Sequence, residues 1–341
     1  MAEVGRVLRL GNIDGIGPFA LTREESSAPG LGEIQVRVEA TSLNYHDFAV
    51  VTGLLGQRPG LTPMSDAAAI ITAVGEDVTA FAVGDRVVSL FFPEWRDGDI
   101  KPAYLRTVPG DRGQGFARDY ATVPAHWFTR APAGYNAAES ATLPCAALTA
   151  WRALMGEAQI KAGDWVVTQG TGGVSLFALQ FAKAVGAKVV ATSSSPEKLE
   201  KLRSLGADAV VNYRETPDWS RAVLDATGGA GADAVMEIGG AGTLGQSIKA
   251  TRLGGRIVLI GVLAGYAGEI PTAEMMRRNI RLHGVTVGSQ AQQCDMIRAI
   301  EATGIRPIVD RSFALEELAD AFAYQASGAH FGKIVVDLAK D

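Results

Sequence analysis

The chain has 341 residues, of which 47% are hydrophobic and 20% charged, and its formal net charge is −5. This length favours two domains, and the composition is typical of a globular protein rather than a disordered one. The acidic balance disfavours nucleic acid and anionic membranes as partners, because both favour a basic surface. No apolar run reaches the roughly 18 residues that span a bilayer. The N-terminus lacks the pattern of a signal peptide, and only two cysteines occur, so we expect a cytoplasmic protein without a disulfide framework.

The first part of the chain, to about residue 130, has the pattern of a β-rich region with irregular loops. Apolar side chains alternate at 33–40, and further strands are predicted at 69–74 and 85–90. Residues 96–118 are rich in Gly, Asp and Arg and are predicted to form a long loop. Loops of that length are usually functional or mobile.

The pattern changes after Pro132. Residues 139–155 are predicted to be helical, with a kink or a new helical segment at Pro144. Strands and helices then alternate, which predicts a parallel sheet covered by helices on both faces. The strands are expected at 165–168, 188–192, 209–211, 234–236 and 256–260, and the helices at 176–185, 196–205, 219–226 and 241–251. The tail is expected to add a strand at 280–287, helices at 291–302 and 315–327, and a strand at 333–338.

A glycine turn joins the strand at 165–168 to the helix that follows it. Gly170 permits the tight turn, and Gly172 allows the backbone to approach a pyrophosphate without a Cβ clash. Ser175 stands where the third glycine of G-x-G-x-x-G would be and is small enough for close packing. Such glycines can simply end a strand, but this turn opens a run of βα units and therefore predicts dinucleotide binding. The expected phosphate contacts are Gly170, Thr171, Gly172, Gly173 and Val174.

The end of the next strand favours NADPH over NADH. An NAD-selective site places an acidic residue there to bind the ribose 2′-hydroxyl. Residues 192–198 instead offer serines and Lys198, which suit a 2′-phosphate, and Glu197 is expected to face elsewhere. The alternative is that Lys198 only covers a solvated helix.

Several ordered motifs along the chain resemble the medium-chain dehydrogenase/reductase superfamily, most closely its zinc-free branch of quinone oxidoreductases and alcohol-dehydrogenase-like proteins. The motifs lie at 32–38, 42–47, 83–87, 141–151, 170–175, 212–214 and 330–333. The resemblance implies an α/β protein with a doubly wound Rossmann domain (131–289). This domain would be inserted into a β-rich, GroES-like catalytic domain (1–130) that the tail (290–341) completes.

The resemblance also implies site residues and an assembly. A homodimer would form by pairing of residues 280–287 with their copy. Tyr213 would assist Ser194 and Lys198 at the 2′-phosphate. The nicotinamide side would be lined by Gly261, Val262 and Val287, with further cofactor contacts from Thr149 and Lys333.

The chain departs from the zinc-binding members of this superfamily. Those members hold the catalytic metal with Cys, His and Cys, whereas the corresponding positions here are Asn44, Ser65 and Cys145. The four-cysteine structural lobe is also missing, because residues 91–119 contain no cysteine. Asp66 and His46 lack the usual spacing of replacement ligands, so no metal is expected.

Without a metal, hydride addition to an activated C=C bond needs less electrophilic help than reduction of a simple ketone. Asn44, Tyr45 and His46 are the candidates to surround the substrate oxygen, with Tyr45 or His46 as proton donor. In the simpler interpretation, Tyr45 is a packed loop aromatic and His46 a solvated histidine. Cys145 is expected to be an inert core thiol, and Asp47 to orient the loop.

These observations favour an NADPH-dependent, zinc-independent oxidoreductase that acts on a small molecule, either an activated C=C bond or a quinone. One alternative is a zinc-free alcohol or aldehyde oxidoreductase. Another, of a different class, is a non-catalytic NADPH-binding structural or sensing protein.

Overall fold

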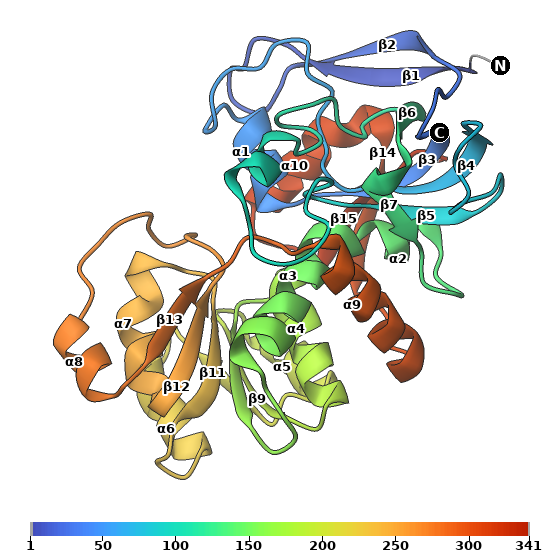
Figure 1. Cartoon of the computed structure of the whole chain (residues 1–341). Coiled ribbons are helices and arrows are strands. Elements are labelled where there is room, and N and C mark those ends of the chain that lie inside the picture. Colours follow the sequence, from blue (N-terminus) through green and yellow to red (C-terminus); the bar gives the residue numbers. More distant parts are fainter. Residues whose placement is uncertain (1–2, 340–341) are drawn as a thin grey trace. The chain divides into compact units, whose positions relative to one another are not determined.

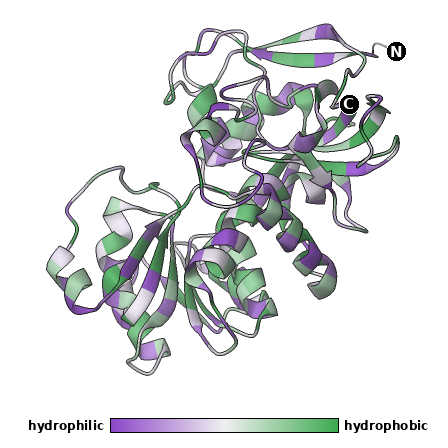
Figure 2. Ribbon diagram, in the orientation of Figure 1, coloured by the Kyte–Doolittle hydropathy of each residue, from purple (hydrophilic) through white to green (hydrophobic). Residues whose placement is uncertain are grey.

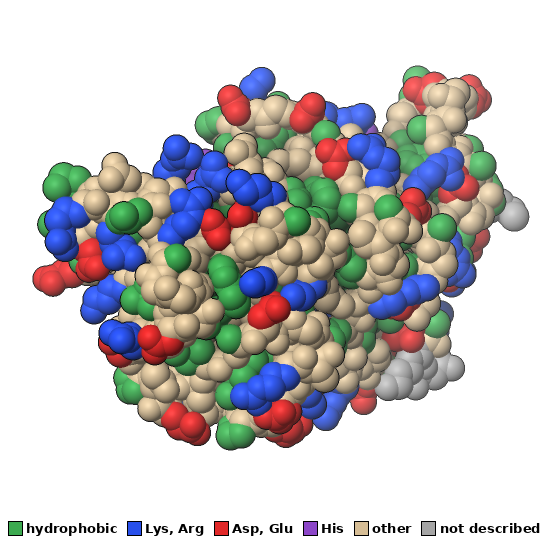
Figure 3. Space-filling model, turned by 90° about the horizontal axis from the view of Figure 1, so that it is seen from below, with side chains coloured by type: hydrophobic (Ala, Val, Ile, Leu, Met, Phe, Trp, Pro, Cys, Tyr) green, Lys and Arg blue, Asp and Glu red, His purple; other side chains and the backbone are tan. Residues whose placement is uncertain are grey.

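The computed structural model describes residues 3–339, which form two compact units (Figure 1). The first unit contains the described residues up to Leu148 together with those from Val287 onward, and the second is Thr149–Thr286. None of the helices within residues 3–339 is both long and apolar enough to cross a membrane. Acidic and basic side chains are interspersed over the face displayed in Figure 3.

The second unit is built on the parallel sheet that the sequence predicts. Its strand order is β10-β9-β8-β11-β12-β13, and every neighbouring pair is parallel. The strands are β8 (Trp165–Gln169), β9 (Lys188–Ser193), β10 (Ala209–Asn212), β11 (Ala232–Glu237), β12 (Thr251–Leu259) and β13 (Arg281–Gly284). The helices are α4 (Gly173–Ala184), α5 (Pro196–Ser204), α6 (Trp219–Ala226), α7 (Ala241–Ala250) and α8 (Thr272–Arg277).

The order of the strands decides which face each helix covers. The chain moves outward through β8, β9 and β10 and then returns to β11 and β12. Right-handed crossovers therefore put α4 and α5 on one face and α6 and α7 on the other. Apolar strand side chains, such as Val167, Val190 and Ile257, are fully buried. The strands of this sheet are largely in the hydrophobic colour in Figure 2. The sheet has the doubly wound arrangement, with its reversal point between β8 and β11.

The first unit contains a seven-stranded, mostly antiparallel sheet and a separate hairpin. The sheet order is β14-β15-β3-β4-β5-β7, and β6 also pairs with β3. Its strands are β3 (Glu33–Ser42), β4 (Ala68–Val74), β5 (Arg86–Ser89), β6 (Tyr120–Pro124), β7 (Phe128–Arg130), β14 (Val309–Ala314) and β15 (Lys333–Asp337). The hairpin is β1 (Glu3–Leu10) with β2 (Phe19–Ser26). The helices are α1 (Tyr45–Val51), α2 (Ala137–Ala141), α9 (Gln290–Thr303) and α10 (Leu318–Ala326), with short 3₁₀ turns at Pro102–Arg106, Ala125–Trp127 and Leu315–Glu317.

The tail completes the first unit, as the resemblance implies. β15 pairs with β3, and Phe322 of α10 packs in the same core as Ile34 and Val36 of β3. We expected a strand at 280–287, but the observed strand β13 is shorter. It stops at Gly284 because its partner β12 ends at Leu259.

The domain boundaries differ from those expected at 130/131 and 289/290. Residues 131–148 belong to the first unit, because α2 packs on β3 and the Ser42 hydroxyl donates to the Ala141 carbonyl at 2.9 Å. The predicted helix at 139–155 is interrupted near Pro144. The helical stretch consists of four short consecutive segments: α2, a π-helical turn (Leu143–Ala147), α3 (Leu148–Trp151) and a second π-helical segment (Arg152–Ala158).

Candidate active site

The turn between β8 and α4 has the geometry of a phosphate cradle. Gly170 has φ +72°, which a residue with a side chain rarely adopts. A Cβ added at Gly170 or Gly172 would meet no heavy atom within 4 Å, so the space beside this backbone is open. Gly172 is the N-cap of α4, whose 12 residues direct their first N–H groups toward the turn. These features fit a bound pyrophosphate.

Buried side chains hold this turn in place. The Ser175 hydroxyl donates to the Gln169 carbonyl at 2.6 Å. This bond joins the start of α4 to the end of β8. The Gln169 amide donates to Glu237 Oε2 at 2.9 Å and accepts from the Ile238 N–H at 2.9 Å. Our sequence interpretation gave Ser175 only a packing role and missed Glu237. The signal for Glu237 is a carboxylate at the end of a fully buried strand.

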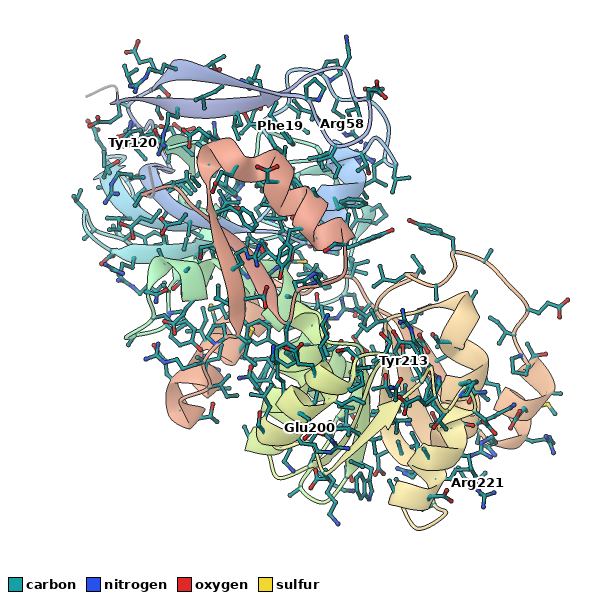
Figure 4. All side chains as sticks on the ribbon, turned by 180° about the vertical axis from the view of Figure 1, so that it is seen from behind. Phe19, Arg58, Tyr120, Glu200, Tyr213 and Arg221 are labelled. Atoms are coloured by element: carbon teal, nitrogen blue, oxygen red, sulfur yellow. The ribbon has the colours of Figure 1, made fainter. Side chains whose placement is uncertain are left out.

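The residues expected at the 2′-phosphate lie at one edge of the sheet. Ser193 and Asn212 end β9 and β10 and are paired in register, and the N–H of Tyr213 donates to the Ser193 carbonyl at 3.2 Å. The Tyr213 side chain is exposed on this edge (Figure 4). Ser195 is the N-cap of α5 and accepts from the N–H of Lys198 at 3.3 Å.

The acidic residue beside this edge is already paired. Glu197 forms an ion pair with Lys201 at 2.7 Å, one turn further along α5. Its carboxylate is therefore paired with Lys201 rather than with Lys198. The structure brings Ser194, Lys198 and Tyr213 to the same strand ends, and their role in binding the 2′-phosphate stays a prediction.

The other expected cofactor contacts are divided between the two units. Thr149, Gly261 and Val262 belong to the second unit, where Gly261 follows β12 and a Cβ on it would lie 2.6 Å from the Ile238 carbonyl oxygen. Val287 and Lys333 belong to the first unit. Val287 has φ +44°, an uncommon conformation for a β-branched residue.

The segment that carries the candidate catalytic residues begins a helix rather than forming the loop that we expected. Asn44 is the N-cap of α1, and Asp47 Oδ2 accepts from the Asn44 N–H at 3.0 Å, which is one of the two bonds of a capping box. The other oxygen of Asp47 accepts from the Ser65 N–H at 2.9 Å. Asp47 therefore fastens α1 to the segment before β4. Burial raises the pKa of Asp47 despite these bonds and the nearby charges of His46 and Lys333.

A buried lysine contacts Asn44. Lys333 on β15 is 4% exposed, and its Nζ donates to Asn44 Oδ1 at 2.5 Å and to the Leu43 carbonyl at 2.6 Å. The Asn44 amide nitrogen donates to Asp66 Oδ2 at 2.8 Å and to Ser65 Oγ at 3.4 Å. Both ends of the Asn44 amide are thus bound to protein groups.

Asp66 is the acidic centre of this cluster. Its Oδ2 also accepts from the Ser42 hydroxyl at 2.9 Å and lies 3.9 Å from Lys333 Nζ, whereas its Oδ1 is buried without a hydrogen-bond partner. Burial raises the pKa of Asp66 to about 7, although Lys333 acts in the opposite direction. The hydrogen bonds from Asn44 and Ser42 also favour the charged form.

The residues at this position do not suit a zinc ion. Zn²⁺ in proteins takes thiolate, imidazole or carboxylate ligands, usually four in all. Here the amide of Asn44 and the hydroxyl of Ser65 lie at two of the positions that hold zinc in the metal-binding relatives. The amide oxygen of Asn44 also already accepts a hydrogen bond from the Lys333 ammonium. Within residues 3–339, no three His, Cys, Asp or Glu side chains gather in a group able to hold a metal ion.

Tyr45 and His46 follow Asn44 in the first turn of α1, and they differ in exposure. The Tyr45 side chain is 43% exposed, and its ring stacks on Phe48 with 5.9 Å between ring centres. The His46 side chain is 27% exposed and meets the ring of Phe91 edge-on at 5.1 Å. His46 Nε2 lies 3.5 Å from Asp111 Oδ2, a partner that no sequence motif indicated. The catalytic roles of Asn44, Tyr45 and His46 remain predictions.

The chain is similar in sequence to known dehydrogenases over both units. Residues 30–133 match the alcohol dehydrogenase GroES-like domain, and residues 173–302 match the zinc-binding dehydrogenase family. A zinc-type alcohol dehydrogenase-like protein from Schizosaccharomyces pombe is 43% identical over 316 residues, which are 90% of this chain and 91% of the relative. The chain belongs to the medium-chain dehydrogenase/reductase superfamily.

Solved structures of this superfamily superpose on nearly the whole chain. An NAD-dependent alcohol dehydrogenase is 31% identical with a TM-score of 0.89, covering 98% of this chain and 99% of its own. The CurK enoyl reductase is 25% identical with a TM-score of 0.81, again covering 98% and 99%. The chain is therefore an oxidoreductase with the fold that binds NAD(P) in this superfamily.

Proposed function

We propose that this protein is an NADPH-dependent, zinc-independent reductase of an activated C=C bond or a quinone. Two observations together carry the proposal. The glycine turn at Gly170 and Gly172 has open space beside its backbone. At the position of a zinc ligand in metal-binding relatives, the Asn44 amide is hydrogen-bonded to the Lys333 ammonium. When bound, the reduced nicotinamide supplies a hydride. The similarity to an enoyl reductase supports a C=C substrate.

The preference for NADPH follows from the edge formed by β9 and β10. Serine hydroxyls, Lys198 and an exposed tyrosine lie there, and Glu197 is ion-paired with Lys201. A 2′-phosphate gains charge-assisted hydrogen bonds in such a setting. The nearby carboxylates of Glu197 and Glu215 are held by Lys201 and Asn212.

Substrate polarisation is assigned to hydrogen-bond donors rather than to a metal. Of the three candidates, Asn44 has both ends of its amide bound within the protein, whereas the His46 and Tyr45 side chains are partly exposed. His46 is assigned as the proton donor, because an imidazole is the commonest general acid in enzymes.

A homodimer is part of the proposal. β13 is an edge strand of the sheet, and its backbone is paired on one side only, with β12. An unpaired strand edge of this kind can accept a second strand from another copy. Sedimentation equilibrium of the purified protein tests this, and a monomer at micromolar concentration would contradict it.

The function is tested by following NADPH absorbance with an enone, a quinone and an aldehyde in parallel, using protein treated with chelator and untreated protein. We expect turnover of the enone or the quinone, with no loss after chelation. Turnover of the aldehyde alone favours the alcohol or aldehyde oxidoreductase, which the NAD-dependent structural relative supports. Tight NADPH binding with no turnover of any substrate favours a non-catalytic role.

A further inference from the structure

The carboxylate of Asp111 is held beside His46 within the first unit. Its Oδ2 lies 3.5 Å from His46 Nε2, its Oδ1 lies 2.9 Å from Arg58, and the Asp111 side chain is only 6% exposed. His46 Nε2 is buried and has no hydrogen-bond partner among the described residues, so Asp111 Oδ2 is an acceptor within reach of a small movement. Arg112 also approaches, with Nε 3.5 Å from Oδ2. Arg58 follows α1 close to the end of the β1–β2 hairpin, where the Leu10 N–H donates to the Leu61 carbonyl at 2.8 Å (Figure 4).

The charged groups around His46 come from separate segments of the chain. Asp111 and Arg112 lie on the long loop, Arg58 lies beyond α1, and Asp47 is the neighbour of His46 on α1 itself. Burial disfavours the charged form of Asp111, but the proximity and charge of His46 and the charges of Arg58 and Arg112 lower the pKa of Asp111 overall. A carboxylate therefore faces His46 throughout the neutral pH range.

The loop that carries Asp111 is fastened to the backbone near Met64. Gly110 has φ +76°, and a Cβ on it would lie 2.7 Å from the Met64 nitrogen. A Cβ on Gly115 would lie 2.3 Å from the Met64 carbonyl oxygen, which also accepts from the Phe116 N–H at 2.9 Å. Two bare Cα positions thus allow a close backbone contact, and this contact determines where Asp111 lies.

We infer that Asp111 is a positioning residue for His46. The Asp111 carboxylate holds the imidazole with Nε2–H directed toward it, so that Nδ1 is the nitrogen that donates a proton to the substrate. This inference rests on the proposed function. Hydride addition to the β-carbon of an enone moves an electron pair onto the carbonyl oxygen and leaves an enolate. His46, protonated on both nitrogens, gives its Nδ1 proton to that enolate and becomes the neutral Nε2–H form, and water then restores the proton.

A carboxylate has two effects on such an imidazole. It selects the tautomer in which the nearer nitrogen keeps its proton, and it stabilises the imidazolium before transfer. The charge of Arg58, 2.9 Å from the opposite oxygen, opposes rotation of the carboxylate away from His46. General acid catalysis of this kind typically contributes about 10²–10⁴-fold to the rate.

The tautomer can be measured without any substrate. The chain has four histidines, so the ¹⁵N signals of His46 in uniformly labelled protein are assigned by comparison with His46→Gln. At about pH 8.5, where an ordinary imidazole is neutral, we expect His46 to be the Nε2–H tautomer in the wild type. Asp111→Asn should shift it toward Nδ1–H, because the new amide can donate to Nε2. Asp99→Asn, an exposed carboxylate on the same loop, is the matched control. An Nδ1–H tautomer in the wild type would overturn the inference.

Steady-state kinetics provide the second measurement. Asp111→Asn should lower kcat by about 10- to 100-fold, with a change of less than about twofold in KM for NADPH, and Asp111→Glu should recover part of the loss. Asp99→Asn should match the wild type. Equal kcat for Asp111→Asn and Asp99→Asn in an active enzyme would refute the positioning role. An inactive wild type would refute the proposed function, while the tautomer would still decide the role of Asp111.

Discussion

The side chains of Gln169 and Glu237, the last residues of β8 and β11, are hydrogen-bonded to each other at 2.9 Å. Gln169 leads directly into the glycine turn, and Glu237 Oε1 accepts from the N–H groups of Gly239 and Gly240 at 2.8 and 2.9 Å. Glu237 is fully buried and also accepts from the hydroxyls of Thr243 and Ser247. The phosphate cradle is therefore supported by a carboxylate whose removal would leave several buried donors unsatisfied.

Replacing that carboxylate should affect both stability and cofactor binding. We expect Glu237→Gln to lower the free energy of unfolding by about 1–3 kcal/mol, because buried donors lose their acceptor. NADPH affinity should fall as well, since the turn loses its anchor. Urea unfolding and fluorescence titration measure the two effects. Glu200→Gln, on the exposed face of α5, is the control and should change stability by less than about 0.5 kcal/mol.

Cofactor selectivity should depend on the charge at Lys198. Lys198→Asp places a negative charge next to the position proposed for the 2′-phosphate. Since a hydrogen bond to a charged group contributes about 1.5–3 kcal/mol, we expect the Kd of NADPH to rise by about 10- to 100-fold. The Kd of NADH should change by less than about threefold, because NADH has no phosphate there. Lys249→Asp, at an exposed position of α7, controls for net charge. Equal losses for both cofactors would show that Lys198 does not recognise the phosphate.

The buried lysine offers a double-mutant test. Lys333→Met leaves Asp66, Asn44 Oδ1 and the Leu43 carbonyl without their cationic partner. Removing one member of a buried charged pair typically costs about 3–5 kcal/mol. We expect a loss of that order in urea unfolding at pH 7.5, and partial recovery when Asp66→Asn is added. Lys249→Met, at an exposed position of α7, should have almost no effect. A Lys333→Met protein as stable as this control would rule out a structural role for the ammonium.

Asp66 should make stability depend on pH in an unusual direction. Its pKa in the folded protein is about 7, compared with an ordinary value of 3.8. Between these values the folded state binds more protons than the unfolded state, so the contribution of Asp66 to stability falls as pH rises. The stability of Asp66→Asn relative to the wild type should therefore improve from pH 5 to pH 8. Urea midpoints at both pH values measure this, and a constant difference would mean that Asp66 titrates normally.

Much of the second unit was predictable from local patterns. The strands and helices from Trp165 to Leu259 were located within three residues, except that β12 begins at Thr251 rather than at 256. A buried strand leaves a short continuous apolar run, and an amphipathic helix leaves a periodic pattern of apolar residues. The same principle explains what was missed. β2 is largely exposed along its length, and β14 is only partly buried, so neither shows a clear alternation. The short helix α1 was missed because it has only 7 residues.

The sequence by itself determined the phosphate cradle, because a strand, its glycines and the following helix are contiguous and their conformations are local. The contacts of Lys333 with Asn44 and of Asp111 with His46 were decided only by the tertiary structure. The first depends on the antiparallel pairing of β15 with β3, and the second on a loop whose glycines pack against the Met64 backbone. Periodicity reports which face of an element is buried, but it does not report which distant segment covers that face.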